Sequence, residues 1–203
     1  MKIGVVSEMT GSADICSPVK ELASLASNAY LGAGEVVLFA LSSPKEEYSF
    51  TNEGLTTVCG DSAMSSQRLV LRYTFQSDAI RNVRFESCGV TDRDCELKFH
   101  MGAKEFSIDI AKAEQQAAQL YYRVLVAIGR AQQENQRTWE FAKSALDIAV
   151  RSMATMPMST AADGKPSLNE HANTVHAWYN ETFAACNPRC YRAVIETNLP
   201  MQT

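Results

Sequence analysis

Five arginines lie within a 26-residue stretch, and their guanidinium groups are the side chains of this sequence best suited to hold an anion. They are Arg68, Arg72, Arg81, Arg84 and Arg93. If the surrounding segments are strands, Arg68 and Arg72 share one outer face and Arg84 points outward on the next strand. A planar guanidinium matches the geometry of phosphate and carboxylate groups. Arg68, Arg72 and Arg84 are therefore the candidate anion-binding residues, for a lipid head group or another small anion.

Internal pairing competes with that interpretation. The predicted partners are the acidic residues of the neighbouring strands, Glu86, Asp92, Asp94 and Glu96. Opposite charges on adjacent strands stabilise a sheet face that is solvated or that meets another subunit. Residues 1–110 hold 10 Lys and Arg against 15 Asp and Glu, and no Lys-rich loop joins the first strands. Internal pairing is therefore the favoured interpretation.

Two groups of residues are possible metal ligands, one acidic and one made of His and Cys. The arrangement along the chain does not favour a metal site for either group. Asp92, Asp94 and Glu96 alternate along one face, whereas a calcium loop wraps its oxygens around the ion. A charged edge strand that resists promiscuous pairing explains them equally well.

The second group is His171, His176, Cys186 and Cys190, which resembles a zinc ligand set. The two histidines are five residues apart and point about 140° apart on one helix, and the order His-His-Cys-Cys is unusual. Two free thiols are favoured over a Cys186–Cys190 disulfide or a zinc site. No metal site and no cofactor are predicted.

Nothing in the sequence indicates catalysis. There is no G-x-S-x-G turn, no Walker loop, and no Cys/His pair in a recognisable nucleophile context. Residues 1–14 resemble the first strand and phosphate loop of a flavodoxin-like protein, but that fold needs helices throughout the next hundred residues. An N-terminal arm or an extra strand is the favoured interpretation. No catalytic residue is assigned, and the chain is predicted not to be an enzyme.

Composition limits the remaining functions. The chain has 203 residues, 46% hydrophobic and 21% charged, which are ordinary values for a globular protein. Its net charge of −4 argues against nucleic acid as a partner. No apolar run reaches the roughly 18 to 20 residues of a membrane span. Six cysteines without an export signal favour a reducing, cytoplasmic location.

The predicted secondary structure that carries these residues changes type at two points along the chain. Ser17-Pro18 predicts the start of an N-terminal helix. From residue 35 to 110 the apolar period is two, and turn signals divide this stretch into about seven short antiparallel strands, typical of a barrel or sandwich. The predicted core consists of inward-facing strand residues and a helical cap: Leu69, Leu71, Tyr73, Val83, Phe85, Leu97, Phe99, Leu120, Tyr121 and Val124.

Beyond residue 110 the period becomes helical. A first stripe ends at Ile128, a polar stretch covers residues 129–137, and a second stripe includes Trp139, Leu146 and Val150. Residues 157–166 are a loop by composition, and a third helix is predicted over 167–185. The second stripe needs a partner surface, so Trp139, Leu146 and Val150 are the candidate interface residues.

Seven strands followed by an amphipathic helix is the order of a pleckstrin-homology (PH)-like barrel, and the residues resemble the bacterial PH domain family. The resemblance covers about residues 17–128. It comprises five features in order: Gly34-Glu35, Phe50-Thr51-Asn52, an Arg-bearing strand ending at Tyr73, Ile80 before Phe85-Glu86, and residues 89–99, which are similar to the G-x-x-D-x-D-x-E-x-K-x segment. It implies the fold, an absence of catalysis and a tendency to form ring-shaped oligomers.

The sequence therefore predicts an α+β protein: an N-terminal arm and helix at 1–34, a PH-like seven-stranded antiparallel barrel with its capping helix at 35–128, and a helical extension at 129–203. The predicted function is a non-enzymatic, homo-oligomeric structural or protein-interaction module. The alternative is a peripheral module that binds an anionic head group through the arginines. Other proteins are further predicted partners, and membrane contact is less favoured.

Overall fold

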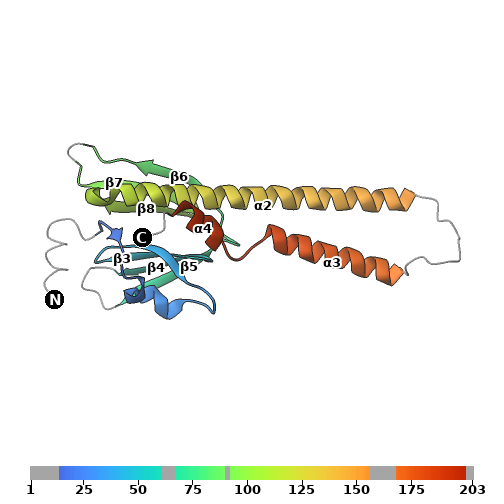
Figure 1. Cartoon of the computed structure of the whole chain (residues 1–203), viewed down its shortest axis with the longest axis horizontal. Helices are drawn as coiled ribbons and strands as arrows, with labels where there is room; N and C mark the ends of the chain where they lie inside the picture. Colours follow the sequence, from blue (N-terminus) through green and yellow to red (C-terminus); the bar gives the residue numbers. More distant parts are fainter. Residues whose placement is uncertain (1–13, 61–66, 90–91, 156–167, 200–203) are drawn as a thin grey trace. The chain divides into compact units, whose positions relative to one another are not determined.

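The computed structural model describes residues 14–60, 67–89, 92–155 and 168–199, apart from the side chains of 152–155 and 168–171. Short strands come first and helices follow (Figure 1). The strands are β1 Ser17–Pro18, β2 Val37–Ser42, β3 Glu46–Thr51, β4 Gly54–Gly60, β5 Arg68–Thr74, β6 Ile80–Glu86, β7 Asp94–Met101 and β8 Lys104–Ala111. The helices are α2 Gln115–Thr155, α3 Leu168–Cys186 and α4 Arg192–Asn198, with 3₁₀ turns η1 Leu22–Ser24, η2 Ala26–Tyr30 and η3 Lys112–Glu114.

The strands form a five-stranded sheet in the order β1-β2-β3-β4-β5 and a three-stranded sheet in the order β6-β7-β8. Neighbouring strands are antiparallel, with Phe50 opposite Leu55 in the first sheet. The predicted α+β class is confirmed, and β2 to β8 are the seven strands expected between residues 35 and 110. Cys16 joins the two sheets: its N–H donates to the carbonyl of Asp109 (2.7 Å), and the next two residues pair with β2.

The core lies between the sheets and the first half of α2. In β7 every second residue is buried, including the predicted Leu97 and Phe99. Phe39 of β2 stacks between Phe50 and Tyr121, with ring centroids 4.5 and 4.6 Å apart. Large apolar side chains in contact contribute the hydrophobic and dispersion energy that stabilises the unit. The predicted cap residues Tyr121 and Val124 are both buried there.

Two predicted core residues are exposed. Leu69 and Leu71 of β5 retain 60% and 41% of their accessible surface, whereas Phe75 just beyond the same strand is buried. The strand β5 is the last in the order of its sheet. Leu69 pairs with Cys59 near the end of β5 that is farther from Phe75. Alternation places both leucines on the expected face, but that face is uncovered at this end of the strand.

The predicted N-terminal helix is wrong. Ser17 and Pro18 form the short strand β1 opposite β2, and only 3₁₀ turns follow. The backbone N–H groups of this segment bond outside it: Val19 donates to the carbonyl of Ala40, and Ala26 and Ser27 donate to the Glu47 carboxylate (3.0 and 2.9 Å). These partners replace the i to i−4 bonds of an α-helix.

The chain forms two compact units. The first comprises the described residues of Met1–Gln132 and Arg189–Thr203, and the second comprises those of Gln133–Pro188. Residues 189–199, which the sequence places in the extension, belong to the first unit because Tyr191 and Ile195 are buried in its core. Within the second unit, the end of α2 and α3 run antiparallel as a helical hairpin (Figure 1). Among the described residues, no helix combines the length and apolarity that crossing a membrane requires.

The six cysteines are free thiols, and we expect them to differ in reactivity. Burial raises the pKa of both Cys16 and Cys95 to about 12, so each remains a neutral thiol at pH 8, with about one molecule in ten thousand as thiolate. Iodoacetamide at pH 8 is expected to label the exposed Cys190 at least about a hundredfold faster than Cys16 in the native protein. Peptide mass spectrometry over time gives the rates, and equal labelling of Cys16 and Cys190 would contradict the buried placement.

Candidate functional site

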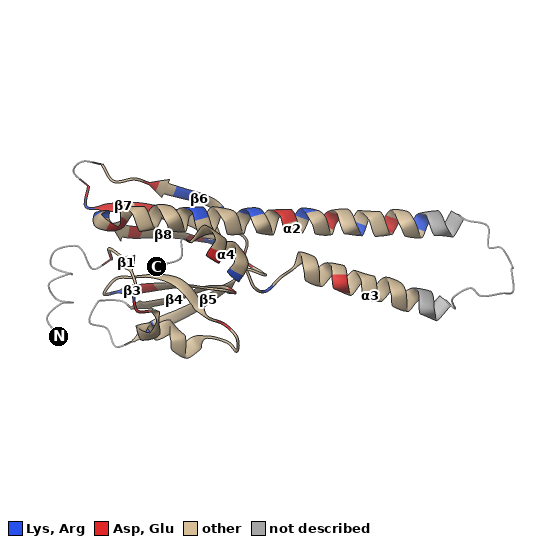
Figure 2. Ribbon diagram, viewed as in Figure 1, with Lys and Arg blue, Asp and Glu red and all other residues tan. Residues whose placement is uncertain are grey.

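The candidate arginines lie on two different sheets. Arg68 and Arg72 belong to β5 of the five-stranded sheet, and Arg84 belongs to β6 of the other. Arg68 is exposed, and its guanidinium donates to the carbonyl of Lys45 (3.1 Å). Arg84 is exposed and pairs with Glu105 (3.4 Å). Charged residues occur on both sheets (Figure 2). An anion site made of all three arginines stays a prediction.

Arg72 forms an ion pair in which the carboxylate is buried and the guanidinium is partly exposed. Its Nη1 lies 2.6 Å from Oε2 of Glu35, whose side chain is only 1% exposed. The same carboxylate accepts hydrogen bonds from the Thr51 hydroxyl (2.7 Å) and the Gly32 N–H (2.9 Å). These donors replace the water that Glu35 loses on burial, which a buried carboxylate requires. Arg72 therefore has a structural partner, and that partner comes from the loop before β2.

The second guanidinium nitrogen of Arg72 reaches Glu53 in the turn between β3 and β4, 3.6 Å away. Glu53 also pairs with Arg189, at 2.9 Å. Beside it the N–H of Tyr191 donates to the carbonyl of Asn52 (2.8 Å). These contacts attach the start of the C-terminal segment to the β3–β4 turn. The charged side chains thus connect the sheet to the loop before β2 and to the C-terminal segment, parts of the first unit that are far apart in sequence.

Internal pairing of the arginines occurs, but with other partners than predicted. Arg72 and Arg84 pair with Glu35, Glu53 and Glu105. The predicted partners Glu86 and Glu96 instead pair with Lys98, at 3.2 and 2.7 Å. The strand register explains the difference. Glu86 of β6 lies directly opposite Glu96 of β7, and Lys98 lies two residues after Glu96 on the same strand, so Lys98 can reach both carboxylates.

The outer face of the three-stranded sheet is an internally neutralised surface. Hydrogen bonds from Lys98 and Ser107 hold the pKa of the Glu96 carboxyl below its usual range. The same contacts, from Glu96 first and Glu86 second, hold the pKa of the Lys98 ammonium above its usual range. Each charge stabilises the ionised form of its neighbour. This face offers mixed charge rather than a basic patch.

Of the two groups considered as possible metal ligands, the acidic group is fully described and the His/Cys group is described without the His171 side chain. Asp92 accepts a hydrogen bond from the N–H of Gly89. Within the described ranges, no group of three or more His, Cys, Asp or Glu side chains is placed to hold a metal ion. Cys186 and Cys190 are both free thiols, which was the favoured interpretation. The His171 side chain and residues 1–13, which carry the flavodoxin-like motif, lie outside the described residues.

The candidate interface residues lie on the hairpin. Trp139 packs edge-to-face on Tyr179 and Phe183 of α3, with ring centroids 4.9 and 5.2 Å apart, so part of the second stripe has a partner within the chain. Leu146 is half-buried and Val150 is exposed. The assignment of these three residues to an interface stays a prediction.

Sequence reasoning missed several exposed apolar residues on the same hairpin. They are Phe141 and Ile148 on α2, and Trp178, Tyr179 and Phe183 on α3. Phe141 is 75% exposed. The signal was present: Phe141 lies off the stripe of Trp139 and Leu146, and residues 172–186 contain one Asp, Glu, Lys or Arg, Glu181. A solvated helix normally carries more charge on its outer face.

Comparison with known proteins shows similarity to a protein family, to a curated protein and to a solved structure. The profile of the family described as Bacterial PH domain matches residues 4–128. "Uncharacterized protein YvbH" of Bacillus subtilis (strain 168) is 34% identical over 116 residues, which are 57% of either chain, so this chain matches little more than half the length of that relative. The crystal structure of a PH-domain-containing bacterial protein from Exiguobacterium sibiricum 255-15 is 27% identical, with a TM-score of 0.83 over 92% of this chain and 100% of that one.

Proposed function

This chain belongs to the bacterial PH domain family, a fold that serves as a module for binding or interaction, and we propose that it acts as a non-enzymatic module that self-associates through its helical hairpin. The observation that carries the proposal is the exposure of large apolar side chains on both helices of the second unit. A reducing compartment such as the cytoplasm suits the six free thiols and forms part of the proposal.

Two helices can bury only the faces that they turn toward each other. In the hairpin that contact is made by Trp139 with Tyr179 and Phe183. Phe141 is left three-quarters exposed, and Trp178 and Phe183 retain 40% and 44% of their surface. Several large apolar side chains exposed on one unit favour an interaction site, because hydration of each of them is unfavourable.

A second copy of the same hairpin is the occupant that fits these faces. Two hairpins packed together make a four-helix bundle, in which every helix lies beside two others and the apolar faces become core. A two-fold interface uses the same patch twice, so an apolar, weakly charged patch is complementary to itself. The residues 133–188 hold four Lys and Arg against six Asp and Glu, so repulsion between copies is small. Whether the assembly is a dimer or a larger ring follows from its mass.

Light scattering on a sizing column under reducing conditions tests the proposal. The full chain is expected to elute as a defined multiple of 22.3 kDa. Phe141→Glu is expected to lower the mass to that of one chain, because the interface would bury an unpaired carboxylate. The control is Gln133→Glu, which adds the same charge to an exposed position in the polar part of α2 and is expected to leave the assembly intact. A wild-type protein that is monomeric at all concentrations would overturn the proposal.

The alternative function, peripheral binding of an anionic head group, would then become the leading hypothesis. It rests on the exposed guanidinium groups of Arg68 and Arg84. Sedimentation with anionic liposomes at low salt would be lost in Arg68→Glu or Arg84→Glu and weakened by added salt. Arg72→Glu is unsuitable as a probe, because it would place three carboxylates together at Glu35 and Glu53.

A further inference from the structure

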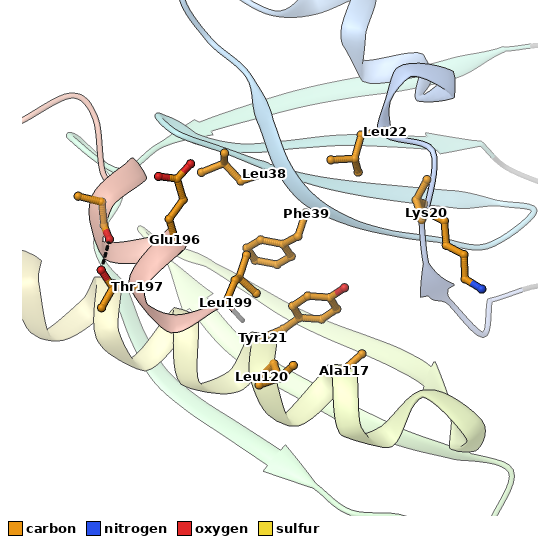
Figure 3. A pocket seen from close by; sticks show the side chains of 12 residues that line it. Lys20, Leu22, Leu38, Phe39, Ala117, Leu120, Tyr121, Glu196, Thr197 and Leu199 are labelled. Atoms are coloured by element: carbon orange, nitrogen blue, oxygen red, sulfur yellow. Dashed lines mark hydrogen bonds between the residues drawn. The ribbon is translucent and has the colours of Figure 1, made fainter. Parts of the chain in front are cut away.

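A pocket of about 790 Å³ opens in the first unit, at a place to which no function has been assigned. Its walls are β2, the start of α2, helix α4 and the segment after β1 (Figure 3). The middle is apolar and includes Phe39, Leu120 and Leu199. Small-molecule sites typically have volumes of about 300–1,000 Å³ and a mainly apolar lining with a few polar groups. Size and lining therefore both suit a small organic ligand.

The walls of this pocket are anchored independently of any ligand. Ile195 of α4 is buried in the core, and the Tyr191 N–H at the start of α4 donates to the carbonyl of Asn52. On the opposite wall, the Val19 N–H donates to the carbonyl of Ala40 (3.0 Å). Because both walls are attached to the five-stranded sheet, the space between them does not depend on their contact with each other. Such a preformed site loses little free energy to ordering on binding.

The hydroxyl of Tyr121 lies at this space and remains accessible to water. Tyr121 is only 8% exposed, and no hydrogen bond of its hydroxyl is found within the described residues. Its ring is held by stacking on Phe39, with the ring centroids 4.6 Å apart, so the direction in which the hydroxyl points is fixed. Burial, with a smaller contribution from Glu114, raises the pKa of Tyr121, so the group is a neutral donor at pH 7. A ligand acceptor can therefore take the place of the water that reaches this donor.

The charges of the pocket are divided between its two sides. In Figure 3 the Tyr121 hydroxyl and Lys20 lie on one side, and the Glu196 carboxylate lies on the other. Glu196 is already paired with Arg192 at 2.7 Å. For the Lys20 ammonium, the described part of the chain supplies neither an ion pair nor a hydrogen bond. One side therefore offers a cation and a hydroxyl donor, next to an apolar middle.

We propose that the pocket binds a single-chain amphipathic carboxylate of the fatty-acid class. Its acyl chain packs against Phe39, Leu120 and Leu199, and its carboxylate accepts a hydrogen bond from the Tyr121 hydroxyl and lies near the Lys20 ammonium. The apolar middle provides most of the binding energy. The two polar groups select a charged head group over a neutral one. This site is separate from the hairpin and does not depend on self-association.

Isothermal titration calorimetry of the full chain with hexadecanoate, its methyl ester and butanoate tests the proposal. Hexadecanoate is expected to bind at one site per chain, the ester to bind at least about tenfold more weakly, and butanoate not to bind, because its short chain buries little apolar surface. Equal affinity for acid and ester would overturn the assigned head-group contacts. An absence of hexadecanoate binding would overturn the proposal as a whole.

Variants locate the binding site. Tyr121→Phe keeps the stacked ring and is expected to weaken hexadecanoate binding about fivefold, whereas the matched Tyr122→Phe, whose ring packs near Phe85, is expected to have no effect. Lys20→Met is expected to weaken binding about fivefold and to remove its salt dependence, with Lys104→Met as control. Ala117→Trp fills the pocket and is expected to abolish binding. Unchanged affinity in Ala117→Trp, with wild-type circular dichroism, would place the ligand elsewhere and contradict the proposal.

Discussion

Arg72→Ala is expected to lower the free energy of unfolding of the first unit by about 3 kcal/mol. The substitution leaves the Glu35 carboxylate, 1% exposed, with the Thr51 hydroxyl and the Gly32 N–H but without a countercharge. Removing one partner of a buried ion pair lowers the free energy of unfolding by more than the intact pair contributes to it. The reason is that the desolvation of the remaining charge is no longer offset. Since Arg72 itself is 34% exposed, we place the effect at the lower end for buried pairs.

The unfolding of each unit is followed by its own probe. Both tryptophans, Trp139 and Trp178, lie in the hairpin, so tryptophan fluorescence follows the second unit. Hydrogen exchange of peptides from β3 to β5, read by mass spectrometry in increasing urea, follows the first. The expected result is a large loss of protection in these strands with an unchanged fluorescence transition.

Two further variants separate the buried pair from general surface effects. Arg84→Ala removes a pair in which both side chains are more than half exposed, and we expect a loss of about 0.5 kcal/mol or less. Arg72→Met combined with Glu35→Gln removes both charges and is expected to recover much of the stability. If Arg72→Ala costs no more than Arg84→Ala, the Glu35 pair is not a structural contact and Arg72 returns to the candidate anion site.

Ile195→Ala in α4 is expected to destabilise the same unit by about 3 kcal/mol. The Ile195 side chain is fully buried among residues of the core, so truncation leaves a cavity that the anchored strands fill only in part. The sequence assigns residue 195 to the helical extension at 129–203 and does not indicate whether that extension packs on the sheets. The large effect follows only if the C-terminal segment completes the core of the first unit.

Exchange at the β3–β4 turn is the sharpest readout of this variant. There the carbonyl of Asn52 accepts from the Tyr191 N–H, and Glu53 pairs with Arg189. We expect faster exchange in α4, in this turn and in the flanking strands together. Glu196→Ala, on the exposed face of the same helix, is the control for helix propensity and is expected to change stability by less than about 0.5 kcal/mol. Faster exchange in α4 alone would show that the helix is an appendage.

The sequence by itself determined which way most side chains face. In β7 the alternation of Leu97 and Phe99 with polar residues predicted one buried face, and that face is buried. The seven strands, the capping helix with Tyr121 and Val124, and the family were all predicted. These features depend on neighbouring residues only, since side-chain direction follows from a backbone period of two or 3.6. Ser17 and Pro18 gave a wrong prediction of a helix start, because both residues pair with the strand β2.

Tertiary structure alone decided what covers each face. Leu69 and Leu71 face inward by their period and nevertheless remain exposed at the end of β5. Glu35 becomes the partner of Arg72, and Tyr191 of Asn52, across long stretches of chain. The pocket beside Tyr121 arises from segments at both ends of the first unit. Each of these contacts joins residues distant in sequence, and a local pattern carries no information about which distant segment will provide the cover.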